Sequence, residues 1–255
     1  MIAEALRTWR TRRRVSQLEL AARAGTTQRH VSFIESGRSA PGRSMIIRLA
    51  ESLEVPIRER NELLLAAGFA PAYPHGDLDG PELRSVRAAL ERVLHGHLPY
   101  PAVVVDRHGD LVAANAGFDA ITRGVTPSLR AAPVSVPRIL LHPEGLAPRI
   151  VNLAQWAWHV IDRVGAESER NPSDRLARLA EELAGYAPPR QVPQDHLGFA
   201  VPLRLRAAGH ELRLVTTLTH FGTATDVTVA ELRLEAFLPA DDATAAALND
   251  LVDAR

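Results

Sequence analysis

Apolar residues recur every three or four positions from residue 3 to residue 66, which is the spacing of amphipathic α-helices. Capping and turn-forming residues divide this stretch into separate elements. The predicted helices cover about 3–14, 16–24, 27–35, 43–53 and 56–67, with the loop SGRSAPG at 36–42. Residues 1–69 are therefore predicted to be an all-α domain.

The second and third of these helices carry specific boundary signals. Ser16 followed three residues later by Glu19 forms a capping box, and Gly25 supplies the left-handed residue that ends a helix. Thr27 is then the N-cap of the next helix. Two short helices joined by so tight a turn are typical of a helix-turn-helix.

After this domain the pattern changes twice. Residues 70–81, APAYPHGDLDGP, combine Pro and Gly without a period and are predicted to be a linker. Residues 82–255 mix helical and alternating stretches, so we expect a second domain of α+β class. Its predicted elements are a helix at 82–94, strands at 102–106 and 110–114, a short helix from Asn115, a long helix within 146–168, a helix at 173–186, strands at 201–206 and 212–218, and a last strand within 226–239 with a bulge near Glu231.

Charge is unevenly distributed, although the whole chain has a net charge of zero. Residues 1–40 hold eight Arg against three Glu, so this segment carries +5 and the rest of the chain −5. Such asymmetry indicates a basic module joined to a domain with a different kind of partner.

A basic helix-turn-helix suits double-stranded DNA, because the major groove admits one α-helix while a second helix holds it in place. The side chains predicted to face outward from the 27–35 helix are Gln28, Arg29, His30, Ser32 and Phe33. Candidate phosphate contacts are Arg13, Arg14, Gln17, Thr27 and Arg38. A small helical core with solvated arginines is the alternative, but it does not explain the capping box, the glycine turn and the polar face together.

These motifs resemble the Xre/Cro–repressor type of helix-turn-helix. The resemblance rests on SQLELAARAGTTQRHVSFIESGRSAP with LAESLEVP following, and it covers about residues 3–66. It implies that Gln17 and Gln28 lie at the DNA surface and that Arg29 and Ser32 reach the bases.

The second domain also resembles known proteins. VVVDRHGDLVAANAGFDAI reads as the hairpin and helix that open a PAS-like domain. RILLHPEGLAPRIVNLAQWAWHVIDRV, LAEELAGY and VPLRLRAAGHELRLVTTLTHF are similar to the MmyB-like transcription regulators common in actinomycetes. That resemblance implies a PAS-like ligand-binding domain, a fatty-acid-like ligand and a homodimer.

The residues themselves also indicate an amphiphile site around the start of the long helix. Arg149, Asn152, Trp156 and His159 are spaced 3, 4 and 3, so they are predicted to share one helical face, and His142 lies near the start of the same helix. An Arg can clamp a carboxylate while a Trp lines an apolar tunnel. The alternative assigns the tryptophans to the core and Arg149 to a surface ion pair.

Other functions for the second domain stay open at this point. It could serve dimerisation or protein contacts alone, with no small-molecule ligand. A haem would need an axial histidine, for which His159 or His220 is the candidate, but there is no attachment motif. We therefore expect no cofactor.

Enzymatic function is disfavoured by the motifs. His95-Gly-His97 lacks a neighbouring carboxylate pattern, and the His-Gly-Asp triplet at 108–110 falls in a predicted hairpin turn. The chain has no cysteine, no HExxH and no GxSxG. There is no apolar leader and no run of about 20 apolar residues, so we expect a cytoplasmic, nucleoid-associated protein with no membrane partner.

The sequence thus predicts a dimeric transcription factor. Each 27–35 helix would enter one major groove of an inverted-repeat operator. The PAS-like domain would bind a small amphiphilic ligand and thereby modulate operator binding.

Overall fold

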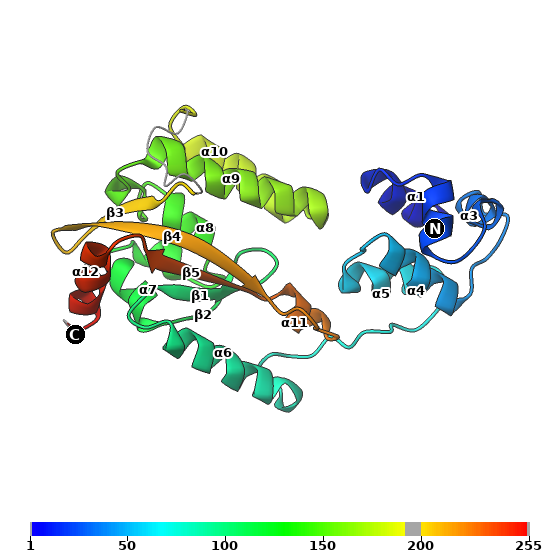
Figure 1. Cartoon of the computed structure of the whole chain (residues 1–255), viewed down its shortest axis with the longest axis horizontal. Coiled ribbons are helices and arrows are strands. Elements are labelled where there is room, and N and C mark those ends of the chain that lie inside the picture. The colour runs from blue at the N-terminus through cyan, green and yellow to red at the C-terminus, as the bar shows by residue number, and fades with distance from the viewer. Residues whose placement is uncertain (1, 192–199, 254–255) are drawn as a thin grey trace. The chain divides into compact units, whose positions relative to one another are not determined.

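The structure, a computed structural model, describes residues 2–191 and 200–253. Two compact units are present. One consists of residues 1–77 together with 223–230, and the other of residues 78–222 together with 231–255 (Figure 1). We call them the DNA-binding unit and the sensor unit, for reasons given below.

The DNA-binding unit contains the five predicted helices. They are α1 (Ile2–Arg12), α2 (Gln17–Arg23), α3 (Gln28–Glu35), α4 (Arg43–Ser52) and α5 (Ile57–Ala66). Their apolar faces meet in one core, in which Leu6, Leu20, Ile34, Ile46 and Leu64 are almost completely buried. The helical period of the sequence therefore predicted these five helices.

The sensor unit is built on a five-stranded antiparallel sheet. The strands are β1 (Ala102–Val105), β2 (Leu111–Ala114), β3 (Leu203–Ala207), β4 (His210–His220) and β5 (Arg233–Pro239). Their order across the sheet is β2-β1-β5-β4-β3, so the last three strands return to pair with the first hairpin. An α+β sensor domain, as predicted, is confirmed.

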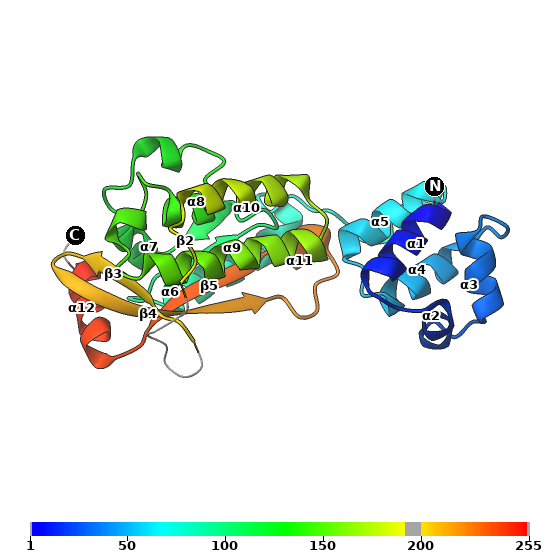
Figure 2. The ribbon, with the colours of Figure 1, turned by 90° about the horizontal axis from the view of Figure 1, so that it is seen from above.

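Helices cover both faces of this sheet (Figures 1 and 2). On one face α6 (Arg84–Gly96) packs Leu90 and Leu94 against Ala102 and Val104 of β1. The larger core lies on the other face, beneath α7 (Ala116–Ile121), α8 (Val136–Leu141), α9 (Leu153–Arg170) and α10 (Asp174–Tyr186), with α12 (Asp242–Asp253). Three short 3₁₀ turns, Pro81–Leu83, Pro127–Arg130 and Ala147–Arg149, complete the unit.

The sequence predictions for the last elements of the chain were in part wrong. The last strand begins only at Arg233, because the residues before it form the short helix α11 (Val227–Glu231), capped by the Asp226 carboxylate. The phase shift near Glu231 marks this change from helix to strand and is not a bulge. The helix α12 was missed.

The long helix also begins later than predicted. Residues Ala147–Arg149 form a 3₁₀ turn and Ile150 pairs with Leu205, so α9 starts at Leu153. The chain leaves the helical conformation at Ile150, whose backbone is extended with ψ 115°, and this separates the 3₁₀ turn from α9. The predicted common helical face of positions 149, 152, 156 and 159 therefore does not form.

The predicted linker is in part bound to the DNA-binding unit. The Asn61 side chain on α5 donates to the Tyr73 carbonyl oxygen at 2.7 Å and accepts from the backbone N–H groups of Ala72 and Tyr73. The segment from Pro71 to His75 consequently lies along α5.

Candidate DNA-binding and ligand-binding sites

The turn between α2 and α3 is fixed by local hydrogen bonds. The Ser16 hydroxyl accepts from the Glu19 N–H at the start of α2, and the Thr27 hydroxyl accepts from the His30 N–H at the start of α3. Gly25 between them has φ +61°, a conformation that glycine adopts without strain. The two predicted N-caps and the glycine turn are confirmed, but the predicted capping box is only half formed, because the Glu19 carboxylate pairs with Arg23 and not with the Ser16 N–H.

The burial of its side chains shows which face of α3 is exposed to solvent. Val31 and Ile34 are each 1% exposed in the core, whereas Gln28 and Arg29 in the first turn are exposed. The N-terminal turn of α3 therefore presents a glutamine and an arginine, the two side chains best suited to bridge purine edges.

The other predicted reading residues are only half-buried and already contact neighbours. His30 Nδ1 lies 3.0 Å from Thr26 Oγ1. The guanidinium groups of Arg29 and Arg38 lie over the Phe33 ring, with their Cζ atoms 5.2 and 5.9 Å from its centroid. Phe33 thus serves as a platform that gathers two cationic groups beside α3.

A buried carboxylate connects α3 to the two helices behind it. Glu35, whose side chain is 4% exposed, accepts from Arg10 Nε at 2.7 Å and from Arg10 Nη2 at 2.9 Å. Gln17 Nε2 donates to the same carboxylate at 2.8 Å. Arg10 and Glu35 were not singled out from the sequence, since two opposite charges 25 residues apart form no recognisable local pattern.

The three arginines predicted to contact phosphates, Arg13, Arg14 and Arg38, differ in their contacts with the rest of the protein. Arg13 donates from its guanidinium to the carbonyl oxygens of Leu53 and Glu54, beyond the end of α4. Arg14 and Arg38 are exposed, and Arg14 has a positive φ of 54° where the chain turns out of α1. The structure therefore leaves Arg14 and Arg38 exposed to a phosphate, while Arg13 also braces two helices.

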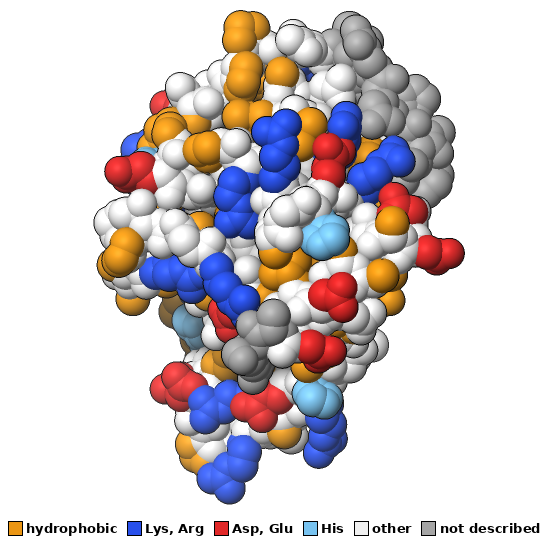
Figure 3. All heavy atoms as spheres, turned by 90° about the vertical axis from the view of Figure 1, so that its left-hand side faces the viewer, with side chains coloured by type: hydrophobic (Ala, Val, Ile, Leu, Met, Phe, Trp, Pro, Cys, Tyr) orange, Lys and Arg blue, Asp and Glu red, His pale blue; other side chains and the backbone are white. Residues whose placement is uncertain are grey.

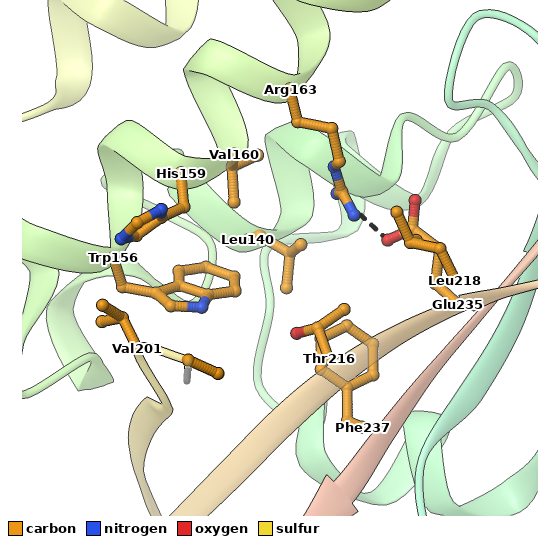
Figure 4. A pocket seen from close by; sticks show the side chains of 11 residues that line it. Leu140, Trp156, His159, Val160, Arg163, Val201, Thr216, Leu218, Glu235 and Phe237 are labelled. Atoms are coloured by element: carbon orange, nitrogen blue, oxygen red, sulfur yellow. Dashed lines mark hydrogen bonds and ion pairs between the residues drawn. The ribbon is translucent and has the colours of Figure 1, made fainter. Parts of the chain in front are cut away.

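In the sensor unit a pocket of about 320 Å³ opens between α9 and the strands β4 and β5 (Figure 4). Its wall is mainly apolar. It is lined by Leu140, Trp156, His159, Val160, Arg163, Ala200, Val201, Thr216, Leu218, Glu235 and Phe237. A mainly apolar pocket with a few polar groups is the usual form of a small-molecule site.

The polar groups of this pocket converge at one place. The Glu235 side chain is 3% exposed and accepts from Arg163 Nη2 at 3.1 Å and from Arg233 Nε at 3.2 Å. Figure 4 shows the Arg163 side chain descending from α9 toward Glu235, across the pocket from Trp156. The group of Glu235, Arg163 and Arg233 carries a net positive charge, and two of its members, Arg163 and Glu235, line the pocket.

Of the five predicted ligand contacts, the structure brings two together. Trp156 is 5% exposed and lines the pocket, and His159 stands exposed on its rim. Asn152 instead joins α9 to β3, since its amide donates to the Pro202 carbonyl oxygen and accepts from the Arg204 N–H. His142 accepts from the Glu144 N–H and packs its ring edge-on against Tyr186.

Arg149 lies at a different place, in a hollow of about 270 Å³ that Arg123 and Arg206 also line. Its guanidinium donates to the carbonyl oxygens of Ile121, Arg123 and Arg206, and burial lowers its pKa. Figure 3 views the sensor unit from the end that carries the β3–β4 turn, where arginine side chains gather. Arg149 therefore braces the ends of α7 and β3 and does not enter the pocket beside Trp156.

Sequence reasoning missed the charged end of the pocket. Arg163 lies one turn beyond His159 on the α9 face that carries Trp156, so extending the spacing by four residues would have found it. Glu235 had a weaker signal. It is a lone acidic residue inside the apolar run LEAFLP of a strand.

The structure also places the histidines that were considered for a metal or haem. Among the described residues no group of three or more His, Asp or Glu could hold a metal ion. His220 ends β4 opposite Arg233 and is not one of the described residues that line the pocket. In the described part of the chain, no helix combines the length and apolarity that a membrane span requires.

Comparison with known proteins agrees with this division. Residues 86–251 match the family described as MmyB-like transcription regulator ligand binding domain, and residues 6–60 match a helix-turn-helix family. An uncharacterized HTH-type transcriptional regulator, y4dL, of Sinorhizobium fredii is 41% identical over 56 residues. That segment is 22% of this chain and 29% of the relative, so the likeness concerns one domain. Since the first match spans more than half of the chain, the protein belongs to the MmyB-like transcription regulator family, with a helix-turn-helix followed by that family's ligand-binding domain.

Proposed function

We propose that α3 reads an operator from the major groove and that the pocket beneath α9 binds an anionic amphiphile that modulates this binding. Gln28 and Arg29 would contact base edges, with Ser32 one turn further on. Gln17, Thr27, Arg14 and Arg38 would hold phosphates. The exposed first turn of α3, set on a buried core, is the observation that supports the DNA contact.

Substitution of Gln28 tests the reading helix. We expect Gln28→Ala to weaken specific binding by about 1–3 kcal/mol and to relax the preference at one base position. Binding to unrelated duplex DNA of the same length should not change, because a base contact contributes nothing there. Selection of operators from random DNA, followed by affinity measurement, provides both values. Unchanged affinity and preference would contradict the assignment of α3.

The ligand class follows from the charges at the pocket end. A carboxylate head group would meet Arg163 and His159, while an acyl chain would lie against Trp156 and Phe237. The surplus of arginine over glutamate around Glu235 is the observation that favours an anionic head group over a neutral or cationic one. A fatty acid has this chemistry.

Comparison of dodecanoate with dodecanol separates the contribution of the ligand's head group to the binding affinity from that of its hydrocarbon chain. We expect the wild type to bind the acid about tenfold more tightly than the alcohol, and Arg163→Gln to lose most of that preference. Glu235 keeps its bond to Arg233 in this variant, so no buried carboxylate is left alone. Arg178→Gln, on the exposed side of α10, is the matched control. An equal preference in all three proteins would exclude this head-group site.

The proposal includes a homodimer on an inverted repeat, acting in the cytoplasm on the nucleoid. Native mass spectrometry of freshly purified protein would give the oligomeric state and any captured small molecule. A dimer that never binds an amphiphile would favour the other function, a sensor unit used for protein contacts alone.

A further inference from the structure

The chain passes between the two units at three places. It crosses once at 77–78, after the predicted linker begins, and again at 222–223 and at 230–231. The last two crossings exist because residues 223–230, which lie between β4 and β5, are part of the DNA-binding unit. We call this stretch the return segment.

Hydrogen bonds join the return segment to the chain that follows α5. The Asp226 carboxylate accepts from the Gly76 N–H at 2.8 Å, and the Thr228 hydroxyl donates to the Gly76 carbonyl oxygen at 2.6 Å. The Val227 N–H donates to the Pro74 carbonyl oxygen, also at 2.8 Å. Both backbone groups of Gly76 are therefore held by side chains of the return segment.

An apolar contact strengthens this attachment. The Val227 side chain is 1% exposed and lines a hollow together with Asn61 and Leu65 of α5 and with Pro74. Asn61 in turn holds the backbone of Tyr73. The return segment, the stretch 71–76 and α5 thus form one packed group within the DNA-binding unit.

On the sensor side the same chain leads directly to the ligand pocket. Leu218 of β4 and Glu235 of β5 line the pocket and lie opposite each other in the ladder. The ladder continues for two more residue pairs and ends at His220 and Arg233. Glu231, which ends α11, is anchored within the sensor unit by a 2.9 Å ion pair with Arg107.

We propose that the return segment couples the pocket to the DNA-binding unit. An occupant that displaces the Leu218–Glu235 pair would move the ends of β4 and β5, and the return segment would transmit this to Gly76 and α5. The inference rests on the proposed function, because it assigns to the same pocket its route of regulation. By linkage, operator DNA would change the affinity for the ligand by the same factor.

The test measures operator affinity with and without 11-(dansylamino)undecanoate, a fluorescent anionic amphiphile, in the full-length protein. We expect the probe to change the operator affinity of the wild type by about fivefold or more, the usual scale of such coupling. Thr228→Val removes the hydroxyl bond to Gly76 at nearly constant volume and is the cleaner variant, whereas Asp226→Ala removes the carboxylate bond to Gly76 together with the cap of α11. Thr225→Val, an exposed threonine of the same segment, is the matched control.

The two variants should bind the probe and the operator separately with affinities within about twofold of the wild type, yet lose most of the probe-induced change. The control should behave as the wild type does. Full coupling in both Thr228→Val and Asp226→Ala would overturn the proposal, and so would a wild type that binds both ligands without any coupling. Hydrogen exchange of the 70–77 peptide, faster in both variants, would show that the attachment itself was released.

A wild type that does not bind the probe would contradict the proposed function and not the coupling route. In that case Leu218→Trp, which places an indole inside the pocket, replaces the probe as occupant. The route is supported if Leu218→Trp alone changes the operator affinity while the double variant Leu218→Trp, Thr228→Val has the operator affinity of the wild type. An identical change in both overturns it.

Discussion

The carboxylate of Glu35 shows how one residue fixes the geometry of the reading helix. It lies at the end of α3 and accepts hydrogen bonds from Arg10 of α1 and Gln17 of α2, so three helices meet on it. Burial acts to raise the pKa of Glu35, but the hydrogen bonds from Arg10 and Gln17 outweigh this and hold it below its usual value. The ionised form is therefore part of the folded state.

Glu35→Gln should lower the free energy of unfolding by about 1–3 kcal/mol at pH 7, because a charge-assisted pair becomes a weaker neutral contact. A carboxyl with a depressed pKa stabilises the fold above its unfolded pKa, and this contribution is lost as the pH falls through the folded pKa. The difference between the two proteins should accordingly shrink below about pH 4. Urea unfolding at pH 7 and at lower pH measures it, with exposed Glu62→Gln as the control. A difference that is independent of pH would contradict this account.

At the scale of elements, Asn115 holds the first hairpin, α6 and α7 together. Its amide donates to the carbonyl oxygens of Leu94 and Tyr100, and its side-chain oxygen accepts from the N–H groups of Ala102 and Phe118. The residue is 6% exposed, so water cannot replace these bonds. Asn115 therefore has a structural role between these elements.

Asn115→Ala should destabilise the sensor unit by about 2–4 kcal/mol, since it leaves the Ala102 N–H and the Tyr100 carbonyl oxygen without their partner, while the Leu94 carbonyl oxygen and the Phe118 N–H keep a backbone bond. Asn249→Ala, on the exposed side of α12, removes an amide of the same size and should cost little. Urea unfolding followed by tryptophan fluorescence reports on the sensor unit through Trp156 and Trp158 when every protein also carries Trp9→Phe, since Trp9 lies in the core of the DNA-binding unit. A loss below about 1 kcal/mol would mean that the hairpin is held by packing alone.

Elements whose boundaries depend on a few adjacent residues could be predicted from the sequence. Elements whose boundaries depend on tertiary contacts could not. Ser16, Gly25 and Thr27 mark the helix-turn-helix because caps and left-handed turns depend on a few adjacent residues. The 3₁₀ turn at Arg149 and the helix α11 interrupt apolar runs that read equally well as longer elements. The pocket contacts of Trp156 and His159 followed from helical spacing, whereas Glu235 joins them from a strand about 75 residues away, which periodicity cannot show.

For the whole molecule, the proposed dimer makes a geometric prediction about its operator. Two copies of α3 related by a two-fold axis would meet successive major grooves on one side of the duplex, with half-sites about 34–36 Å apart. Binding both half-sites at once raises the affinity, because the second contact is intramolecular.

Insertion of five base pairs between the half-sites turns the second one to the opposite side of the duplex, by about half of a 10–10.5 base-pair turn. We expect the affinity to fall to nearly that of an isolated half-site, a loss of about 100-fold or more. Insertion of ten base pairs returns the second half-site to the same side of the duplex as the first. The operator affinity should then be higher than after insertion of five, provided that the two DNA-binding units of the dimer span the longer distance. Gel-shift titration of the three operators, with a single half-site as reference, measures these differences. Equal affinity for all of them would mean that each head binds alone, and the paired-groove arrangement would have to be given up.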